Sequence, residues 1–282
     1  MRIVEYLLGG PLRLMARVIE VSAPRNETVA SRWLRAPTDI VGSEVCIFLI
    51  YAPAGELSEH SLFHARAWAQ AGFKVIAVVN TEAIEVDPSA DALSFASGVL
   101  IRENRGYDFG AWASVINELP AIREASLLAI ANDSMYGPLN TFGKMIERAR
   151  ELDADVVGVT ESVQFGRHFQ SFLIFFKPRA LKSRAFQRFW SNVRAGGRTL
   201  AVYRYELGLV RTLERAGLRC AALFPSADWR NPTLTRWREL IEGGLPYLKI
   251  ALLRDNMFEV DTSGWESVLR EGGFDPALAD RH

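Results

Sequence analysis

The sequence contains very little cysteine and no long hydrophobic run. Its two cysteines, Cys46 and Cys220, both lie inside apolar segments. This usage argues against a disulfide framework or a cysteine-based metal site and is typical of buried free thiols in a reducing compartment. No run of 18 or more apolar residues occurs, so we expect no transmembrane helix. These features predict a cytoplasmic protein.

An excess of either charge is also missing, as are several nucleotide-binding signatures. Lys and Arg total 33, as do Asp and Glu, so we expect no nucleic-acid partner. The dinucleotide motif Gly-x-Gly-x-x-Gly, the P-loop and the Gly-x-Ser-x-Gly elbow of α/β-hydrolases are all absent. Only four histidines occur, and His60 and His64 lie four residues apart. Because no third ligand is evident, we interpret this pair as surface residues and not as metal ligands.

Short, continuous apolar runs alternate with amphipathic segments through most of the chain. Such runs are typical of strands that are buried on both faces, and their alternation with helices indicates a mostly parallel sheet. The predicted strands are 44–51, 74–80, 98–101, 126–131, 155–160 and 172–177, and the predicted helices are 57–72, 112–119, 141–152, 180–194 and 206–216. We therefore predict an α/β fold with helices flanking the sheet.

Three regions follow from this pattern. Residues 41–230 are predicted to form the α/β domain, with a helical N-terminal segment before it (1–40) and a helical C-terminal extension packed on it (231–282). Within the first region, residues 1–21 combine apolar side chains with Arg2, Arg13 and Arg17. This stretch is either a helix pair packed on the domain or a basic, amphipathic element that contacts the inner face of a membrane.

Two polar, glycine-bearing clusters are the most informative feature of the sequence. One spans 102–112 and the other 131–138, and each follows an apolar run directly. In an open parallel sheet, ligands bind outside the carboxyl ends of the strands. We therefore expect the two clusters to lie on neighbouring strand ends and to form one site.

These clusters open a series of motifs whose order and spacing extend from about residue 45 to about residue 256. The motifs are Arg-Glu-Asn-x-Gly-x-Asp-Phe-Gly-Ala-Trp (102–112), Asn-Asp-Ser-x-Tyr-Gly-Pro (132–138), Asp-x-x-Gly-x-Thr (155–160), His-x-Gln-Ser-x-x-x-x-Phe-Lys (168–177), Phe-x-x-Phe-Trp (186–190), Tyr-Glu-x-Gly-Leu (205–209), and Asn-Pro-Thr with Pro-Tyr-Leu-Lys further on. The chain thereby resembles the rhamnan synthesis protein F family, bacterial glycosyltransferases that build rhamnose-containing cell-surface polysaccharide. Each motif alone is weak, but together they are specific.

The resemblance implies a GT-A-type, Rossmann-like fold that binds a nucleotide-sugar donor such as dTDP-rhamnose. It places the donor against the two clusters, at Asn104, Gly106, Asp108, Asn132, Asp133 and Ser134. Enzymes of this type commonly hold Mg²⁺ or Mn²⁺ on an Asp-x-Asp motif, whereas this sequence has Asn-Asp-Ser, which leaves Asp133 as the candidate ligand. In a purely structural interpretation, Asp133 stabilises a turn and Asp108 is the N-cap of the next helix.

The acceptor side is implied by the later motifs. A transferase that inverts the anomeric centre needs a carboxylate base, and Glu206, just before a predicted helix, is the first candidate. Glu161 is the second candidate base. In a purely structural interpretation, Glu206 is a carboxylate in the first turn of a helix, where the helix dipole stabilises negative charge. His168, Gln170 and Ser171 are expected to shape the site for a polysaccharide or lipid-linked oligosaccharide acceptor. Two other functions stay open. One is a catalytically silent glycan-binding or assembly protein on the same fold, which is favoured because Asn-Asp-Ser lacks the second acidic residue of Asp-x-Asp. The other is a nucleotidyltransferase, against which the absence of a basic glycine-rich loop counts.

Overall fold

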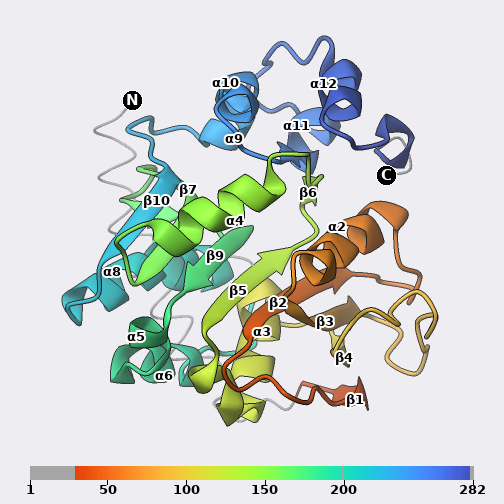
Figure 1. The fold of residues 1–282 in the computed structure, drawn as a ribbon, viewed down its shortest axis with the longest axis vertical. Helices are drawn as coiled ribbons and strands as arrows, with labels where there is room; N and C mark the ends of the chain where they lie inside the picture. Colours follow the sequence, from red (N-terminus) through yellow and green to blue (C-terminus); the bar gives the residue numbers. More distant parts are fainter. Residues whose placement is uncertain (1–28, 198–199, 280–282) are drawn as a thin grey trace.

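The computed structural model describes residues 29–197 and 200–279. Its centre is a twisted sheet whose strands follow the order β1-β4-β3-β2-β5-β9-β7-β10 (Figure 1). The strands span Ser31–Arg35 (β1), Gly98–Glu103 (β4), Lys74–Thr81 (β3), Glu44–Tyr51 (β2), Leu127–Asn132 (β5), Leu173–Phe176 (β9), Val156–Ser162 (β7) and Cys220–Phe224 (β10). Only β1 and β9 run antiparallel to their neighbours within this path. The mostly parallel α/β fold predicted from the sequence is confirmed.

The central strands form where the sequence is apolar at every position. In β2 the alternate residues Val45, Ile47 and Leu49 pack into one core cluster, while Cys46, Phe48 and Ile50 pack into another. A strand with two buried faces needs apolar side chains at both sets of positions. The continuous run in the sequence therefore marks the middle of the sheet.

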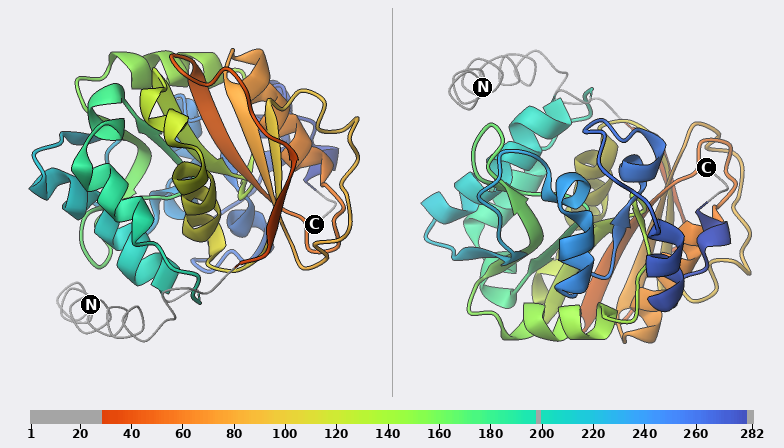
Figure 2. Two further views of the ribbon diagram at one scale, coloured as in Figure 1. Left: turned by 90° about the horizontal axis from the view of Figure 1, so that it is seen from below. Right: turned by 90° about the horizontal axis from the view of Figure 1, so that it is seen from above.

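Helices cover both faces of the sheet, as Figure 2 shows from below and from above. One face carries α2 (Glu59–Gln70) and α4 (Phe142–Glu151). The opposite face carries α3 (Tyr107–Glu118), η1 (Pro120–Glu124), α5 (Pro178–Leu181), α6 (Arg184–Ser191), the π-helical segment η2 (Ala201–Glu206) and α8 (Leu207–Arg215). The predicted helix at 112–119 begins five residues earlier than expected, at Tyr107, because the polar cluster itself enters the helix after Gly106.

An aromatic cluster fixes the start of α3 against α6 and η2. The Phe109 ring stacks on Trp190 with centroids 5.9 Å apart, and it lies 5.9 Å from the ring of Tyr205. All three side chains are buried. This packing sets Asp108, which precedes Phe109, opposite Glu206, which follows Tyr205.

The C-terminal region contains α9 (Pro232–Thr235), α10 (Trp237–Glu242), α11 (Ile250–Arg254), α12 (Trp265–Glu271) and η3 (Pro276–Leu278). It also contains a short strand, β11 (Leu248–Lys249), that the sequence did not suggest. This strand pairs with β6 (Met135–Tyr136), which lies within the second polar cluster. The pairing places Lys249 opposite Met135 and so brings the tail into contact with the strand ends.

Two further expectations concern the N-terminal region. The described part of the predicted helical segment 1–40 forms a strand, β1, which pairs with β4 and extends the sheet. No residue of β1 is fully buried, and polar and apolar side chains are mixed in it, as suits an edge strand that is covered on one side only. The amphipathic stretch 1–21 lies outside the described residues. Within the described ranges, no helix combines the length and apolarity needed to cross a membrane.

Candidate functional site

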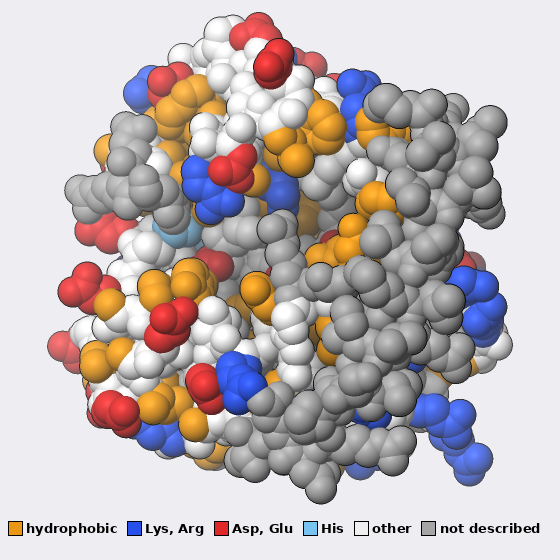
Figure 3. All heavy atoms as spheres, turned by 180° about the vertical axis from the view of Figure 1, so that it is seen from behind, with side chains coloured by type: hydrophobic (Ala, Val, Ile, Leu, Met, Phe, Trp, Pro, Cys, Tyr) orange, Lys and Arg blue, Asp and Glu red, His pale blue; other side chains and the backbone are white. Residues whose placement is uncertain are grey.

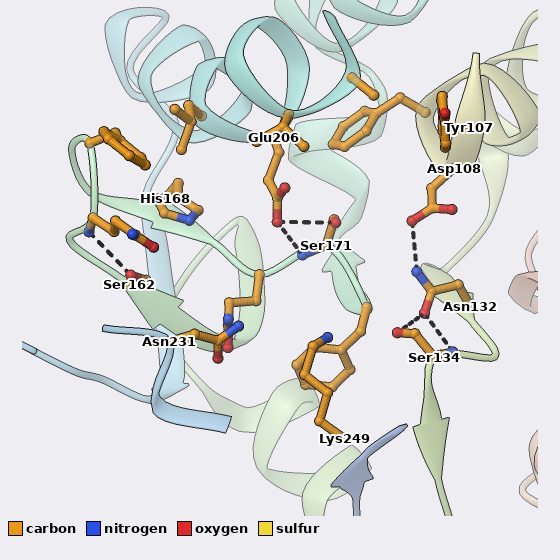
Figure 4. A pocket seen from close by; sticks show the side chains of 18 of the residues that line it. Tyr107, Asp108, Asn132, Ser134, Ser162, His168, Ser171, Glu206, Asn231 and Lys249 are labelled. Carbon is orange, nitrogen blue, oxygen red and sulfur yellow. Dashed lines mark hydrogen bonds between the residues drawn. The ribbon is translucent and has the colours of Figure 1, made fainter. Parts of the chain in front are cut away.

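A cavity of about 440 Å³ lies at the carboxyl ends of β5 and β7. The intervening strand β9 runs in the opposite direction, so its beginning reaches the same edge. Asp108 comes from α3, Glu206 from η2 and Lys249 from β11 (Figure 4). Asn132 is the last residue of β5, and Asp133 and Ser134 belong to the turn after it. His168 belongs to β8 (His168–Phe169), and Gln170 and Ser171 follow it directly. Eight of the eleven residues predicted for the site line this cavity.

Asp108 reaches the cavity by a route that the sequence did not predict. β4 and β5 are not neighbours, since β3 and β2 lie between them. The chain after β4 crosses these strand ends, and the buried Arg102 holds the crossing by donating to the carbonyl oxygens of Glu103 and Arg105, at 2.9 and 2.6 Å. The Arg102 guanidinium is thus committed to the backbone.

The Asp108 carboxylate is the first charged group of the cavity. Its Oδ2 accepts a hydrogen bond of 2.8 Å from Nδ2 of Asn132, which joins the two polar clusters directly. Burial raises the pKa of Asp108 to about 6, and the negative charge of Glu206 adds to this, while the Asn132 hydrogen bond and Lys249 oppose it. Gly106, with φ of 80°, is the N-cap of α3, so Asp108 lies inside the first turn and is not the cap.

The Asn132-Asp133-Ser134 turn is held from two sides. Oδ1 of Asn132 accepts hydrogen bonds from the amide and the hydroxyl of Ser134, at 3.2 and 2.7 Å. Oδ2 of Asp133 accepts from the Tyr51 amide at 2.8 Å and from the Ser61 hydroxyl at 3.0 Å. Burial raises the pKa of Asp133 to about 6 despite these two donors. Asp133 therefore ties β2 and α2 to the turn while it also lines the cavity.

The two histidines of α2 are buried, contrary to the surface location expected from the sequence. Nε2 of His60 lies 3.3 Å from the carbonyl oxygen of Asp133, and Nε2 of His64 lies 2.9 Å from the hydroxyl of Tyr247. Burial lowers the pKa of His64 to about 3, so this ring is neutral. The expectation was wrong because the inner face of α2 packs under the turn, where imidazoles can exchange hydrogen bonds without carrying charge.

Glu206 faces Asp108 across the cavity, at the point where η2 passes into α8 (Figure 4). Its Oε1 accepts hydrogen bonds of 3.2 Å from both the amide and the hydroxyl of Ser171. Beside it, Nδ1 of His168 lies 2.8 Å from the carbonyl oxygen of Gly166, and Oε1 of Gln170 accepts from the Thr160 hydroxyl at 2.7 Å. Ser171, two residues before β9, thereby holds Glu206 in a fixed orientation.

Lys249 is a site residue that the sequence analysis missed. Among the described residues that line the cavity, it is the only Lys or Arg. Burial lowers the pKa of its ammonium group, while the carboxylates of Glu206 and Asp108 raise it. The signal that could have identified Lys249 is the Pro-Tyr-Leu-Lys motif (246–249), which was noted without a role. Its position depends on the β6–β11 pairing, which no local pattern reveals.

Three predicted residues lie away from the cavity. Oδ1 of Asn104 accepts from Nδ2 of Asn80 at 3.3 Å, and Gly106 packs closely against Ala195. Glu161 forms an ion pair with Nε of Arg167 at 2.8 Å, and Nη1 of the same arginine lies 2.6 Å from Glu214. None of the three lines the cavity.

The residues around Asp133 provide a small donor set for a divalent cation. Within the described parts of the chain, no group of three or more His, Cys, Asp or Glu side chains could hold a metal ion. Asp108 and Asp133 nevertheless line the same cavity, and each has a raised pKa. Mg²⁺ is commonly held by one or two carboxylates, with water and phosphate oxygens completing the octahedron. These two side chains fit that pattern only when a phosphate-bearing substrate supplies further ligands.

Two bacterial proteins are similar in sequence to part of this chain. The virulence protein VirA of Vibrio anguillarum is 27% identical over 192 residues, which cover 55% of this chain and 62% of VirA. The protein y4gN of Sinorhizobium fredii is 28% identical over 195 residues, covering 67% of this chain and 50% of that protein. The chain thus spans less than two thirds of the length of these relatives.

Among solved structures, a 4-diphosphocytidyl-2C-methyl-D-erythritol synthase of Anaerococcus prevotii superposes with a TM-score of 0.37 and 11% identity, over 65% of this chain and 90% of that one. The sequence model of rhamnan synthesis protein F matches residues 63–262, a stretch that contains every residue lining the cavity. Because this match covers more than half of the sequence, the chain belongs to the rhamnan synthesis protein F family.

Proposed function

We propose that this protein is a glycosyltransferase that moves a sugar, with rhamnose favoured, from a nucleotide-sugar donor to a cell-surface polysaccharide or lipid-linked oligosaccharide acceptor. Family membership supports a role in polysaccharide synthesis. The observation that carries the proposal is the cavity itself, where the Asp108–Asn132 pair, Glu206 and Lys249 face one another from four separate elements. Pockets that combine a few convergent polar groups with perturbed pKa values are typical of active sites.

The donor side is assigned to Asp108, Asn132, Ser134 and Lys249. A nucleotide sugar leaves a diphosphate when its glycosidic bond breaks, so the site must stabilise growing negative charge on that leaving group. Lys249 can supply this stabilisation, because it is the only Lys or Arg among the described residues that line the cavity. Its ammonium group is partly buried and lies near the carboxylates of Glu206 and Asp108. Pre-positioned charge in a poorly hydrated site stabilises such a transition state more than the same charge in water.

The acceptor side is assigned to Glu206, with His168, Gln170 and Ser171 around it. In the proposed reaction, Glu206 takes the proton of an acceptor hydroxyl, the oxygen bonds to the anomeric carbon, and the bond from that carbon to the diphosphate oxygen breaks. Ser171 holds one carboxylate oxygen of Glu206 through two hydrogen bonds, which leaves the other oxygen to act as the base. Attack from this side opposite the leaving group would invert the anomeric centre.

Asp133 and Asp108 are the side chains that would hold Mg²⁺ or Mn²⁺, if the reaction uses one. A bound divalent ion would neutralise charge on the diphosphate, as Lys249 is proposed to do. Both carboxyl groups must lose their protons before they can bind a cation, and burial raises the pKa of each to about 6. Any metal affinity should therefore weaken as the pH falls through 6.

Thermal unfolding in the presence of nucleotide diphosphates and their sugars, with and without Mn²⁺, tests the proposal. A ligand at one hundred times its Kd stabilises the folded state by about 2.7 kcal/mol. We expect a matching nucleotide sugar to raise the melting temperature and, with an acceptor, to be consumed. Binding without turnover would favour the catalytically silent alternative. If no nucleotide or nucleotide sugar shifts the melting temperature, the proposal is wrong.

The raised pKa of Asp108 predicts a trade-off between stability and activity. The pKa of Asp108 is about 6 in the folded state, against an ordinary value of 3.8. Between pH 3.8 and pH 6 the folded state therefore binds more protons than the unfolded state. As the pH rises through this range, ionisation of Asp108 lowers the stability of the fold. Asp108→Asn should therefore raise stability at pH 7.5 by about 1 to 2 kcal/mol, allowing for solvent screening. The same change should impair transfer, because the charge in the site is lost.

Melting temperatures measured from pH 3.5 to 8 check this expectation. The difference between Asp108→Asn and the wild type should become small as the pH falls towards 3.5, because the carboxyl group is then protonated in the folded state and mostly protonated in the unfolded state, where its pKa is 3.8. Asp91→Asn is a matched control, since Asp91 is exposed and lies outside the cavity. A variant that is less stable than the wild type at pH 7.5 would show that Asp108 is mainly a structural residue.

A further inference from the structure

Charge is distributed unevenly in this neutral chain. Residues 178–217 carry nine Arg and Lys residues but only two acidic ones, Glu206 and Glu214. Glu206 points into the cavity, where Ser171 binds it, and Glu214 is paired with Arg167. The outer side of this segment, which forms α5, α6, η2 and α8, therefore has a strong positive excess.

The arginines of this segment gather on one surface. Arg184 and Arg188 are one helical turn apart on α6, as Arg211 and Arg215 are on α8, and all four are exposed. In Figure 3, which shows the molecule from behind, several blue Arg and Lys side chains lie at the right-hand edge, the side on which α6 and α8 lie when Figure 1 is reversed. Helices α6 and α8 lie in contact, so their arginines belong to one continuous surface.

Two depressions in this surface share Arg188. One, of about 550 Å³, is lined by Arg123, Arg184 and Arg188; the other, of about 370 Å³, is lined by Arg188, Arg194, Arg204 and Arg215. We call these six arginines the basic face. Among the described residues, no Asp or Glu lines either depression. A surface of this kind is suited to binding anions.

Basic residues beside the basic face have acidic partners, which sets Arg184, Arg188 and Arg215 apart. Arg179 pairs with Asp155 at 2.7 Å and Lys182 with Glu124 at 3.1 Å. Within the described ranges, the side chains of Arg184, Arg188 and Arg215 have no such partner. Holding several unneutralised arginines close together is unfavourable unless an external anion compensates them.

We propose that the basic face binds the phosphate headgroups of an anionic phospholipid membrane. A guanidinium group can form two parallel hydrogen bonds with one phosphate. The six arginines of the basic face are spread over its surface, so they are suited to a membrane, which presents many phosphates at once. The aromatic residues of α6, Phe186, Phe189 and Trp190, are buried, so they provide no platform on which the bases of a single-stranded nucleic acid could stack. The chemistry of the face therefore favours headgroups.

The position of the face adds a supporting observation. Arg204, which belongs to the face, and Glu206, which lines the cavity, are part of the same π-helical segment. If the proposed function is right, membrane binding would bring a lipid-linked acceptor to the side of the cavity where Glu206 lies.

Co-sedimentation of the full chain with vesicles tests the proposal without any measurement of transfer. We expect binding to vesicles that contain phosphatidylglycerol, no binding to phosphatidylcholine alone, and weakening by salt. Each arginine near an anionic surface contributes about 1 kcal/mol, or about fivefold in partition coefficient. The triple variant Arg184→Gln, Arg188→Gln, Arg215→Gln should therefore partition about a hundredfold less.

The matched control removes three charges from the opposite side: Arg66→Gln, Lys74→Gln, Lys144→Gln, all exposed in the wild type. It should keep most of the binding, and melting temperatures should show that both variants are folded. Equal losses in the two triple variants would mean that only net charge matters and would overturn the proposal. Sedimentation with neutral vesicles would also overturn the proposal. The same holds if the protein binds single-stranded RNA or inorganic phosphate but does not bind vesicles.

Discussion

Glu206→Gln is expected to lower kcat by about 10²- to 10⁴-fold while the affinity for the nucleotide-sugar donor stays close to that of the wild type. Loss of a general base typically reduces a rate by this factor. Gln keeps the shape of the side chain and can still accept from the Ser171 amide and hydroxyl, so the local structure should persist. Donor binding should survive because its proposed contacts come from other elements. Calorimetry for the donor and turnover on the same preparation measure both effects.

Glu161→Gln is the natural control for this variant. Glu161 was the second candidate base, but it pairs with Arg167 and lies outside the cavity. We expect its loss to alter stability slightly and turnover little. If instead Glu161→Gln abolishes turnover, or if Glu206→Gln loses donor affinity and keeps kcat at saturation, the base is misassigned and Glu206 belongs to the donor side.

Lys249→Met is expected to weaken donor binding and to lower kcat by about 10²- to 10³-fold. Removing one pre-positioned group that stabilises charge in a transition state has an effect of this size. Met fills a similar volume, and the β6–β11 pairing is made by the backbone, so the fold should be retained. The neighbouring carboxylates of Asp108 and Glu206 would also lose their compensating charge. Binding of nucleoside diphosphates, compared with the corresponding nucleosides, isolates the contribution of phosphate.

The control for Lys249 is Lys144→Met, an exposed lysine of α4 away from the cavity. It should leave binding and turnover unchanged. A Lys249→Met protein that binds nucleoside diphosphate as tightly as the wild type would remove this residue from the donor site. If added Mn²⁺ restores the variant, the cation and the lysine stabilise the same charge.

Much of the fold could be predicted because local sequence and burial coincide. β2, predicted at 44–51, has those bounds in the structure, and β3 and β5 differ from expectation by at most one residue at either end. Strands at the middle of a sheet are apolar on both faces, so their signal needs no knowledge of their neighbours. β1 was missed because an edge strand lacks that continuous run.

The assembly of the site depended on contacts that no local pattern contains. The sequence places Asn132 one helix and one strand after Asp108, but it does not show that two strands separate their elements in the sheet. Their hydrogen bond exists because Arg102 and the packing of Phe109 carry the chain across the intervening strand ends. For the same reason, the sequence could offer Glu161 as the second candidate base, although its ion pair with Arg167 holds it outside the cavity.

By itself, the sequence determined the α/β class, the central strands and the polar clusters that end them, because hydrophobic burial and turn chemistry act over a few residues. Only the tertiary structure decided which polar groups meet. It reversed β9 so that Ser171 reaches Glu206, and it paired β11 with β6 so that Lys249 enters the cavity. Such pairings join residues far apart in the chain, and their free energy comes from the burial of the whole core, not from the residues that they bring together.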